Sequence, residues 1–294
     1  MAVEMRRHNL EVLEINETHS MQVGQQRLAS GELLLYSGHD EENAPHTRGV
    51  ALMLSKQAQN ALMGSESHGL RTIKASFKTK KEGTTMNVIQ CCTPTSDYNE
   101  DVKDHFDDRL QSIVEKCLTK NLTILMGDLN AKVEMDITGY EDIVGRHVLR
   151  ERNDNGEIFV NLCAFNKLVI GGTIFPHKRI HKTTWTSPNH TTRYQIDHIA
   201  VNKRFRKTME EVRTRRGSGI ASDYHLLVTK IKLKLKTYCA TGRAISKSFN
   251  TASLRGTDKR NKFKIVLSSK FQALHDLLNE KETTMESKWK GNKE

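Results

Sequence analysis

The sequence predicts an α/β protein with sheets at the centre and helices outside them. Short apolar runs rich in β-branched residues recur between turn residues, which is typical of buried strands. These runs alternate with two stretches whose apolar residues have helical spacing. Such interleaving favours packed layers of sheet and helix. With 294 residues, the chain can also bury a substantial core.

Nine apolar runs are expected to form strands, many of them buried on both faces. Another apolar run ends at Glu17. The nine runs are residues 33–38, 49–54, 71–79, 86–92, 122–128, 168–175, 182–187, 195–201 and 225–235.

Two helices are expected, over residues 101–118 and 156–167. The periodicity is clearest in the first, because five apolar side chains share one face of it. They are Phe106, Leu110, Ile113, Val114 and Cys117.

The composition divides the chain into a domain over 1–236 and a tail over 237–294. The tail begins with a polar, Ser/Thr/Gly-rich linker and continues with a basic amphipathic helix. Residues 201–294 hold 23 Lys/Arg against 9 Asp/Glu, a net of +14, whereas residues 1–200 hold 23 against 26, a net of −3. Concentrated positive charge favours a polyanionic partner such as nucleic acid, although a solvated basic tail is equally compatible with it.

The cysteine pattern and the apolar runs indicate the compartment. Five cysteines without a C-x-x-C pair argue against a zinc knuckle or a disulfide framework and favour a reducing environment. The first twenty or so residues lack the apolar core of a signal peptide, and no run approaches membrane-spanning length. We therefore expect a soluble intracellular protein with no membrane partner.

The stretch TILMGDLNAK, residues 123–132, ends a buried strand and places Asp128 two residues before Asn130. In an extended segment these two side chains point to the same side. A carboxylate that takes a proton and an amide that positions a phosphoryl oxygen would suit phosphate chemistry. The alternative is a strand end followed by an Asx turn.

Three further acids lie at or near strand ends. Glu17 is either a solvated glutamate or a ligand for Mg²⁺, which one carboxylate and several waters can hold. Asp197 lies inside the apolar run QIDHIAV, where an acid is costly unless it is paired or functional. Asp223 precedes the last expected strand.

Taken together, the segments ETHS, GDLNA, TW at 184–185, QIDHIAV and SDYHLLV resemble, in order and spacing, the endonuclease/exonuclease/phosphatase superfamily of exonuclease III, the AP endonucleases and DNase I. Four longer stretches are similar to the endonuclease domains of RTE-type non-LTR retrotransposons: LLLYSGHDEENAPHTRGVALMLSKQA, ERNDNGE, GGTIFPHKRIHKTTW and KRFRKTMEEVRTRRG. The resemblance covers about residues 1–236. It implies a DNase I-like four-layer α/β sandwich, in which two packed mixed sheets are flanked by helices.

The resemblance also implies a reaction, namely Mg²⁺-dependent attack of water on a DNA phosphodiester, with Mn²⁺ as a possible substitute. The 3′-hydroxyl left behind could prime reverse transcription. By this resemblance, Glu17 is the Mg²⁺ ligand, Asp128 activates the water and Asn130 orients the phosphate. The tail is similar to the connector before a reverse transcriptase, a domain absent from this chain. Nuclear localisation follows from the family and the basic tail, with the cytosol as the alternative.

Four other positions take their roles from the same resemblance. Asp197 is similar to the buried aspartate that supports the catalytic histidine, and Asp223 to the acid that precedes this histidine. Asn155 and Trp185 lie in segments similar to loops near the DNA.

The sequence departs from the family pattern in three ways. Tyr224 stands where the catalytic histidine is expected, and His225 comes one residue late, so that in an extended chain it would face the opposite side. Cys92 replaces a phosphate-contacting tyrosine, and a thiol is a shorter and weaker donor. The first strand of the family, which carries a metal-site asparagine, is expected to be missing.

Two hypotheses follow. The first is an impaired Mg²⁺-dependent DNA endonuclease, a phosphodiester hydrolase by descent. It is favoured by Glu17, Asp128, Asn130, Asp197 and Asp223. The three departures favour an inactive pseudonuclease that binds nucleic acid or has no selected role. A phosphatase or sphingomyelinase on the same fold is less favoured, because the local matches are to retrotransposon sequences.

Overall fold

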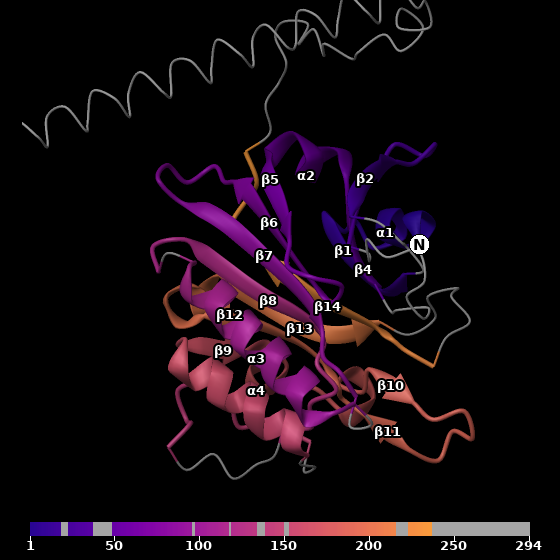
Figure 1. Ribbon diagram of the computed structural model, residues 1–294, viewed down its shortest axis with the longest axis vertical. Coiled ribbons are helices and arrows are strands. Elements are labelled where there is room, and N and C mark those ends of the chain that lie inside the picture. Colours follow the sequence, from indigo (N-terminus) through magenta and orange to yellow (C-terminus); the bar gives the residue numbers. More distant parts are fainter. Residues whose placement is uncertain are drawn as a thin grey trace, which may run out of the picture. The chain divides into compact units, whose positions relative to one another are not determined.

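The computed structural model describes residues 1–18, 23–37, 49–95, 98–117, 119–133, 139–149, 153–215 and 223–236. The expected tail over 237–294 lies outside these residues. The elements run along the chain as follows (Figure 1): α1 (Ala2–Arg7), β1 (Val12–Thr18), β2 (Gly24–Arg27), β3 (Leu33–Tyr36), β4 (Gly49–Leu54), α2 (Lys56–Ala61), β5 (Leu62–Ser67), β6 (Thr72–Lys78), β7 (Thr85–Cys92), α3 (Glu100–Glu115), β8 (Leu122–Asp128), α4 (Asp154–Phe165), β9 (Leu168–Ile170), α5 (Gly171–Ile174), the 3₁₀ turn η1 (Arg179–His181), β10 (Trp185–Thr186), β11 (Arg193–Tyr194), β12 (Asp197–Asn202), the 3₁₀ turn η2 (Lys203–Thr208), β13 (Met209–Arg215) and β14 (Leu226–Ile231).

A six-stranded mixed sheet forms the centre, in the order β5-β6-β7-β8-β12-β9. Only the β7–β8 pair is parallel, and α3 makes the crossover between these two strands. β7 and β8 are apolar almost without interruption because both faces of this sheet are covered.

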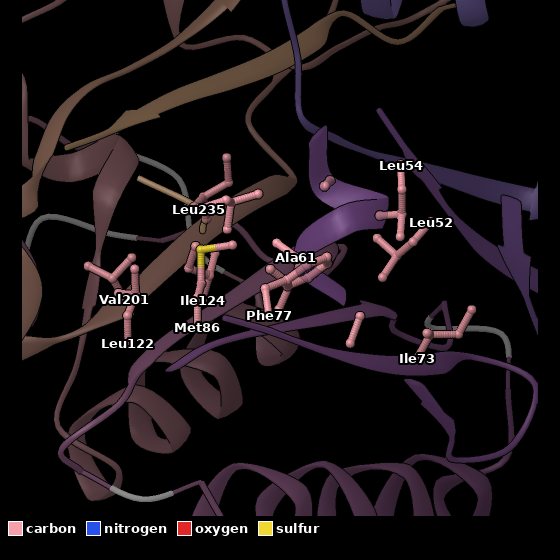
Figure 2. Packing of buried hydrophobic residues seen from close by; sticks show 14 of the residues in the cluster. Leu52, Leu54, Ala61, Ile73, Phe77, Met86, Leu122, Ile124, Val201 and Leu235 are labelled. Atoms are coloured by element: carbon pink, nitrogen blue, oxygen red, sulfur yellow. The ribbon is translucent and has the colours of Figure 1, made fainter. Parts of the chain in front are cut away.

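A second layer of strands covers one face of this sheet. It consists of the antiparallel sheet β1-β4-β3-β2 and the hairpin β13–β14. Figure 2 shows side chains of the buried cluster between the layers. Leu52 and Leu54 of β4 belong to this cluster together with Phe77 of β6 and Ile124 of β8.

Helices form the outer layers. The buried face of α3 contributes Leu110, Ile113 and Val114 to a second cluster on the other face of the six-stranded sheet, and Phe159 of α4 joins them. On the far side, Met5 of α1 is buried in a third cluster with side chains of β1 and β4. The order helix, sheet, sheet, helix confirms the predicted layered α/β fold, and the two expected helices are α3 and α4.

Several expected strands are shorter than predicted. The run 225–235 is a strand only over β14, and the run 33–38 only over β3. The run 168–175 is a strand only to Ile170, where the hydroxyl of Thr173 donates to the Ile170 carbonyl oxygen (2.6 Å) and the chain turns into α5. A side chain on Gly171 would lie 2.9 Å from the carbonyl oxygen of Ile199, so this turn packs closely against β12. The run 182–187 forms a strand only at β10.

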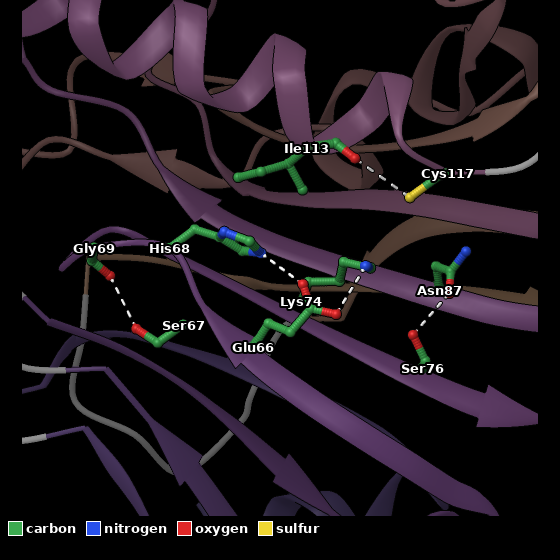
Figure 3. A network of polar contacts seen from close by, with 9 residues as sticks. All are labelled: Glu66, Ser67, His68, Gly69, Lys74, Ser76, Asn87, Ile113 and Cys117. Atoms are coloured by element: carbon green, nitrogen blue, oxygen red, sulfur yellow. Dashed lines mark hydrogen bonds and ion pairs between the residues drawn. The ribbon is translucent and has the colours of Figure 1, made fainter. Parts of the chain in front are cut away.

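The outer edge of the six-stranded sheet is polar. On β5, Glu66 pairs with Lys74 of β6 (3.1 Å) and contacts His68 (3.1 Å), as Figure 3 shows. Charged side chains on an edge strand oppose pairing with another sheet. In the part of the chain that the structure describes, no helix combines the length and the apolar character that crossing a bilayer requires.

Candidate active site

Three adjacent strands bring polar side chains together at one end of the six-stranded sheet. β7 ends at Cys92, β8 ends at Asp128 and β12 begins at Asp197. Cys92 is the register partner of Asp128, which in turn is paired with Asp197. The three residues therefore form a row across the sheet, with both aspartates buried.

The turn after β8 gives Asp128 and Asn130 a different geometry from the expected one. Asn130 has a φ of 47°, and its backbone N–H donates to Oδ1 of Asp128 (3.1 Å). This is an Asx turn, so the expectation of an extended segment with both side chains on one side was wrong. The Asn130 amide instead donates to the carbonyl oxygen of Thr93 (3.2 Å), which ties the turn to the segment after β7.

A close approach of β8 to β7 requires Gly127. Its φ is 151°, and a Cβ at this position would lie 1.7 Å from the carbonyl oxygen of Cys91. Glycine alone tolerates this conformation and this contact. Gly127 therefore fixes where the backbone delivers Asp128.

Asn153 and His198 hold the loop that follows Asp128. The Asn153 side chain caps α4 by accepting from Gly156 N–H (2.9 Å), accepts from Lys132 N–H (2.7 Å) and donates to the Asn130 carbonyl oxygen (2.7 Å). The buried His198 contacts the Ala131 carbonyl oxygen through Nε2 (2.8 Å). Sequence reasoning missed both residues, although an Asn before a helix is a recognisable N-cap signal.

Glu17 reaches the same end of the sheet through an irregularity in β1. The register of the β1–β4 pair shifts between Ile15 and Thr18, and Glu17 has a φ of 56°. Bulges of this kind re-aim a side chain and are common beside active sites. Glu17 lines a groove of about 330 Å³ together with Asp128 and Asp197.

Tyr224 and His225 line this groove too, but they point to different partners. The Tyr224 hydroxyl donates to Oδ2 of Asp128 (3.3 Å), while Nε2 of His225 lies 3.1 Å from Oγ1 of Thr186. The two side chains thus diverge, as the alternation of an extended chain predicts. Asp223 is exposed, and its carbonyl oxygen accepts from Thr186 N–H (2.9 Å).

Trp185 lies beside this segment because it forms a β-bridge with Tyr224. Its ring stacks on Tyr194 at a centroid distance of 5.8 Å, and the ammonium of Lys132 lies 3.3 Å from the Tyr194 ring centroid. Asn155 is in the first turn of α4, where its amide donates to the Pro94 carbonyl oxygen (3.4 Å).

Asp128 raises the pKa of two neighbouring acids and of a phenol. Glu14 on β1, a residue that sequence reasoning missed, has its pKa raised to about 8 by burial and by the nearby Asp128. Burial, Asp128 and Glu14 raise the pKa of Asp197 well above its ordinary value, and Thr184 opposes the shift. Burial and then Asp128 raise the pKa of the Tyr224 phenol, so this group is a neutral donor at ordinary pH.

A cation stands next to Cys92. The Arg71 guanidinium lies 4.0 Å from the Cys92 sulfur and 4.8 Å from the centroid of the Tyr98 ring. Burial and the nearby Asp128 raise the pKa of the Cys92 thiol to about 12, which keeps it protonated, although Arg71 lowers it. Arg71 also lines an open groove of about 920 Å³ with His68, His105 and Arg109. Sequence reasoning missed this basic groove because its side chains come from separate segments.

The acids fit a sparsely coordinated divalent ion. In the described part of the chain, no three His, Cys, Asp or Glu side chains form a preassembled metal cluster. Mg²⁺, however, is commonly held by one or two carboxylates with waters and substrate oxygens. Glu17 and Asp128 supply such oxygens on the wall of the groove.

Comparisons with known proteins place this arrangement in a known fold. No family model matches the chain. Over 243 residues it is 34% identical to "Craniofacial development protein 2" of Tragulus javanicus and of Bos taurus. The matched residues cover 82% of this chain and 40% and 39% of the two relatives, respectively. The chain thus spans about two fifths of the length of the curated relatives it matches.

The solved structures decide the fold. The catalytic domain of Xenopus laevis APE2 superposes with a TM-score of 0.60 at 14% identity, covering 81% of this chain and 88% of that one. The endonuclease domain of TRAS1, a telomere-specific non-LTR retrotransposon, gives a TM-score of 0.55 at 12% identity, covering 79% and 90%. The chain has the DNase I-like fold and is similar over 243 residues to craniofacial development protein 2. The predicted resemblance is therefore confirmed at the level of the fold and of the similarity to this protein.

Within this DNase I-like fold, the candidate active site consists of the row Cys92, Asp128 and Asp197 together with the flanking Glu17 and Tyr224. Cys92 and Tyr224 are the positions where the sequence departs from the superfamily pattern, and both lie in the immediate surroundings of Asp128.

Proposed function

We propose that this chain is a Mg²⁺-dependent DNA endonuclease domain with reduced activity, of the kind that nicks target DNA for a retrotransposon. The observation that carries the proposal is the meeting of Glu17, Asp128, Asp197 and Tyr224 around a single groove at one end of the sheet. The similarity of the fold to the catalytic domain of APE2 and to the endonuclease domain of TRAS1 supports DNA as the substrate.

In this proposal the chain's own residues divide the work on a phosphodiester. Asp128 accepts the proton of the attacking water through a carboxylate oxygen. Glu17 holds Mg²⁺, which supplies neutralisation of the charge on the reacting phosphate. The neutral Tyr224 hydroxyl can donate one hydrogen bond, but it carries no positive charge.

In this proposal Arg71 contacts the phosphate in place of the tyrosine hydroxyl that is lost because Cys92 stands at that position. Its guanidinium lies beside Cys92, the register partner of Asp128, and the Tyr98 ring centroid is 4.8 Å from it. A guanidinium pairs well with phosphate oxygens because its donors match their geometry. The basic groove that Arg71 shares with Arg109 is suited to the DNA backbone. Nuclear localisation belongs to the same proposal.

A second candidate function, that of a DNA-binding pseudonuclease, is favoured by one contact. The Tyr224 hydroxyl donates to Oδ2 of Asp128 and so occupies one oxygen of the residue proposed to take up a proton. Tyr224 also stands at the position of the expected catalytic histidine, which as a cation would stabilise phosphoryl charge.

Nicking of supercoiled plasmid in the presence of Mg²⁺ tests the two functions. We expect slow nicking that Glu17→Ala abolishes, and faster nicking by a Cys92→Tyr, Tyr224→His double variant. An inert natural protein with an active double variant supports the pseudonuclease. If neither protein nicks, although both are folded by circular dichroism and bind DNA, the proposed active site is wrong.

A further inference from the structure

A further groove lies at the opposite end of the six-stranded sheet from the candidate active site. Thr85 at the start of β7 and Asn121, the residue before β8, belong to its lining. Cys92 and Asp128 end the same two strands, so roughly 20 Å of strand separates them from this groove, at about 3.3 Å per residue. The groove has a volume of about 590 Å³ and shares no lining residue with the groove of the candidate active site or with the basic groove.

Four exposed lysines from three separate segments line this groove, which we call the lysine groove. They are Lys78, Lys81, Lys120 and Lys236. Among the residues that the structure describes, Glu82 is the one acid of the lining. Positive charges gathered on one concave wall raise the local concentration of anions. The lysine groove is therefore suited to a negatively charged ligand.

Backbone hydrogen bonds hold the three lysine-bearing segments together. Lys236 N–H donates to the Lys78 carbonyl oxygen (3.0 Å), which joins the segment after β14 to the end of β6. The Asn121 side chain accepts from Thr85 N–H (3.2 Å), which joins the segment before β8 to β7. The backbone that carries the lysines is thus arranged before a ligand binds, and such preorganisation lowers the cost of binding.

The positive surface extends beyond the lysine groove on two sides. The exposed Lys80 and Lys234 are adjacent, because Lys80 N–H donates to the Lys234 carbonyl oxygen (2.9 Å). On another side, the Lys81 ammonium lies 6.0 Å from the centroid of the Phe205 ring. The Arg204 guanidinium of η2 lies 5.9 Å from the same centroid. A surface of this extent fits a chain of phosphates, which contacts many cations in turn, better than a single small anion.

We propose that the lysine groove and its flanking cations bind the phosphate backbone of a nucleic-acid strand, at a surface separate from the candidate active site. The lysine ammonium groups contact phosphate oxygens as point charges, and the release of counterions supplies affinity. Contacts of this kind carry no sequence information. The surface retains a nucleic acid whether or not the candidate active site cleaves it, so this proposal does not rest on the proposed function.

Protection of lysines from acetylation tests the proposal. The probe is a deoxythymidine strand of roughly 20 nucleotides, long enough to span a single-strand binding surface. The full chain is acetylated without Mg²⁺, with and without the probe, and mass spectrometry measures the modification of each lysine. We expect acetylation of Lys78, Lys81 and Lys120 to fall several-fold when the probe is present. Lys56 of α2 is the internal reference and should be modified equally in both samples.

Matched variants show whether charge at this surface supplies the affinity. Fluorescence anisotropy with the labelled probe should give about tenfold weaker binding to Lys81→Gln, Lys120→Gln, with a slope of log Kd against log salt that is lower by about 1.4 for two lost contacts. Lys81→Arg, Lys120→Arg keeps the charge and should keep both values. Arg27→Gln, Lys56→Gln removes the same charge from exposed positions of β2 and α2 and should change neither.

The choice of probe distinguishes the kinds of nucleic acid. Equal protection of the three lysines by single-stranded RNA, single-stranded DNA and duplex DNA supports recognition of the backbone itself, and protection by one of them alone assigns the surface to that strand type. Three outcomes would overturn the proposal: no protection by any nucleic acid, an unchanged salt slope for Lys81→Gln, Lys120→Gln, or equal protection by polyglutamate, which would assign the surface to an acidic peptide. Absence of plasmid nicking contradicts the proposed function alone, because these measurements need no cleavage.

Discussion

The hydroxyl of Tyr224 donates a hydrogen bond to Oδ2 of Asp128 over 3.3 Å, between residues 96 positions apart in the sequence. Oδ1 of the same carboxylate accepts from Asn130 N–H at 3.1 Å. Both oxygens of Asp128 are therefore engaged, one by the Asx turn and one by the phenol. The Asx turn follows from the local sequence, whereas the phenol contact depends on residue 224. Tyr224 is therefore the first residue to substitute.

Replacing Tyr224 by histidine is expected to accelerate Mg²⁺-dependent nicking of plasmid DNA. An imidazole can become cationic near neutral pH and stabilise charge on the phosphate, whereas the phenol cannot. The single change should raise the rate by about tenfold or more, and the double change with Cys92→Tyr on the order of 100- to 1000-fold.

Tyr224→Phe is the control for this change, because it removes the hydroxyl that donates to Asp128 without adding a cation. A rate for Tyr224→Phe equal to that of Tyr224→His would show that the phenol inhibits by blocking Asp128 rather than by lacking charge. No gain from either variant would contradict a catalytic position for residue 224.

Replacing Asp128 by asparagine is expected to reduce nicking about 100-fold or more, because an amide cannot accept the proton of water. The same change removes the negative charge that raises the pKa of Glu14 and Asp197. The pKa of Glu14 should therefore fall from about 8, which can be followed by NMR titration of its carboxyl carbon. Unchanged cleavage by Asp128→Asn would refute the role given to the GDLNA stretch.

Removing the Asn153 side chain is expected to impair both stability and nicking. Its three hydrogen bonds join α4 to the loop after Asp128, and loss of an N-cap alone costs roughly 1 to 2 kcal/mol. Asn99→Ala is the matched control, since Asn99 caps α3 through Asp101 N–H and, among the residues that the structure describes, makes no such bridge. Urea unfolding should show both losses, with a lower rate for Asn153→Ala alone. Equal rates would mean that the loop keeps its place without Asn153.

Strand and helix positions were predictable because their patterns are local. Apolar runs fixed β4, β7 and β8, and helical spacing fixed the buried face of α3. Element ends were less predictable where tertiary contacts decide them. The run expected as a strand over 168–175 turns at Gly171, because the chain packs tightly against β12.

The candidate site was predictable only in part. The motifs identified Asp128 and Asp197, whose pairing then follows from the sheet register. The importance of Glu14 could not be derived, because a glutamate in an alternating strand is usually solvated, and only the fold places it in the same groove as Asp128. Arg71 was missed for the same reason, since its neighbour Cys92 is 21 residues away in the sequence.

The pH dependence of folding gives the most direct test of Glu14. Its pKa is raised from 4.5 to about 8 in the folded protein by burial and by Asp128. Between these values the folded state holds a proton that the unfolded state has released, so the free energy of unfolding falls as the pH rises, by about 1.4 kcal/mol per pH unit for one group. Above the folded pKa the loss is complete.

Glu14→Gln should abolish this fall in the free energy of unfolding, because glutamine resembles the protonated carboxyl at every pH. The variant and the natural protein are expected to have similar Tm values near the ordinary pKa of glutamate, and the variant should be increasingly more stable up to the raised pKa. Asp197 contributes a slope of the same sign to both proteins, and a smaller one in the variant, because Glu14 no longer helps to raise the pKa of Asp197. Glu82→Gln, in the exposed turn after β6, should follow the natural protein throughout. A difference in Tm that does not change with pH would mean that the pKa of Glu14 is not raised in the folded protein.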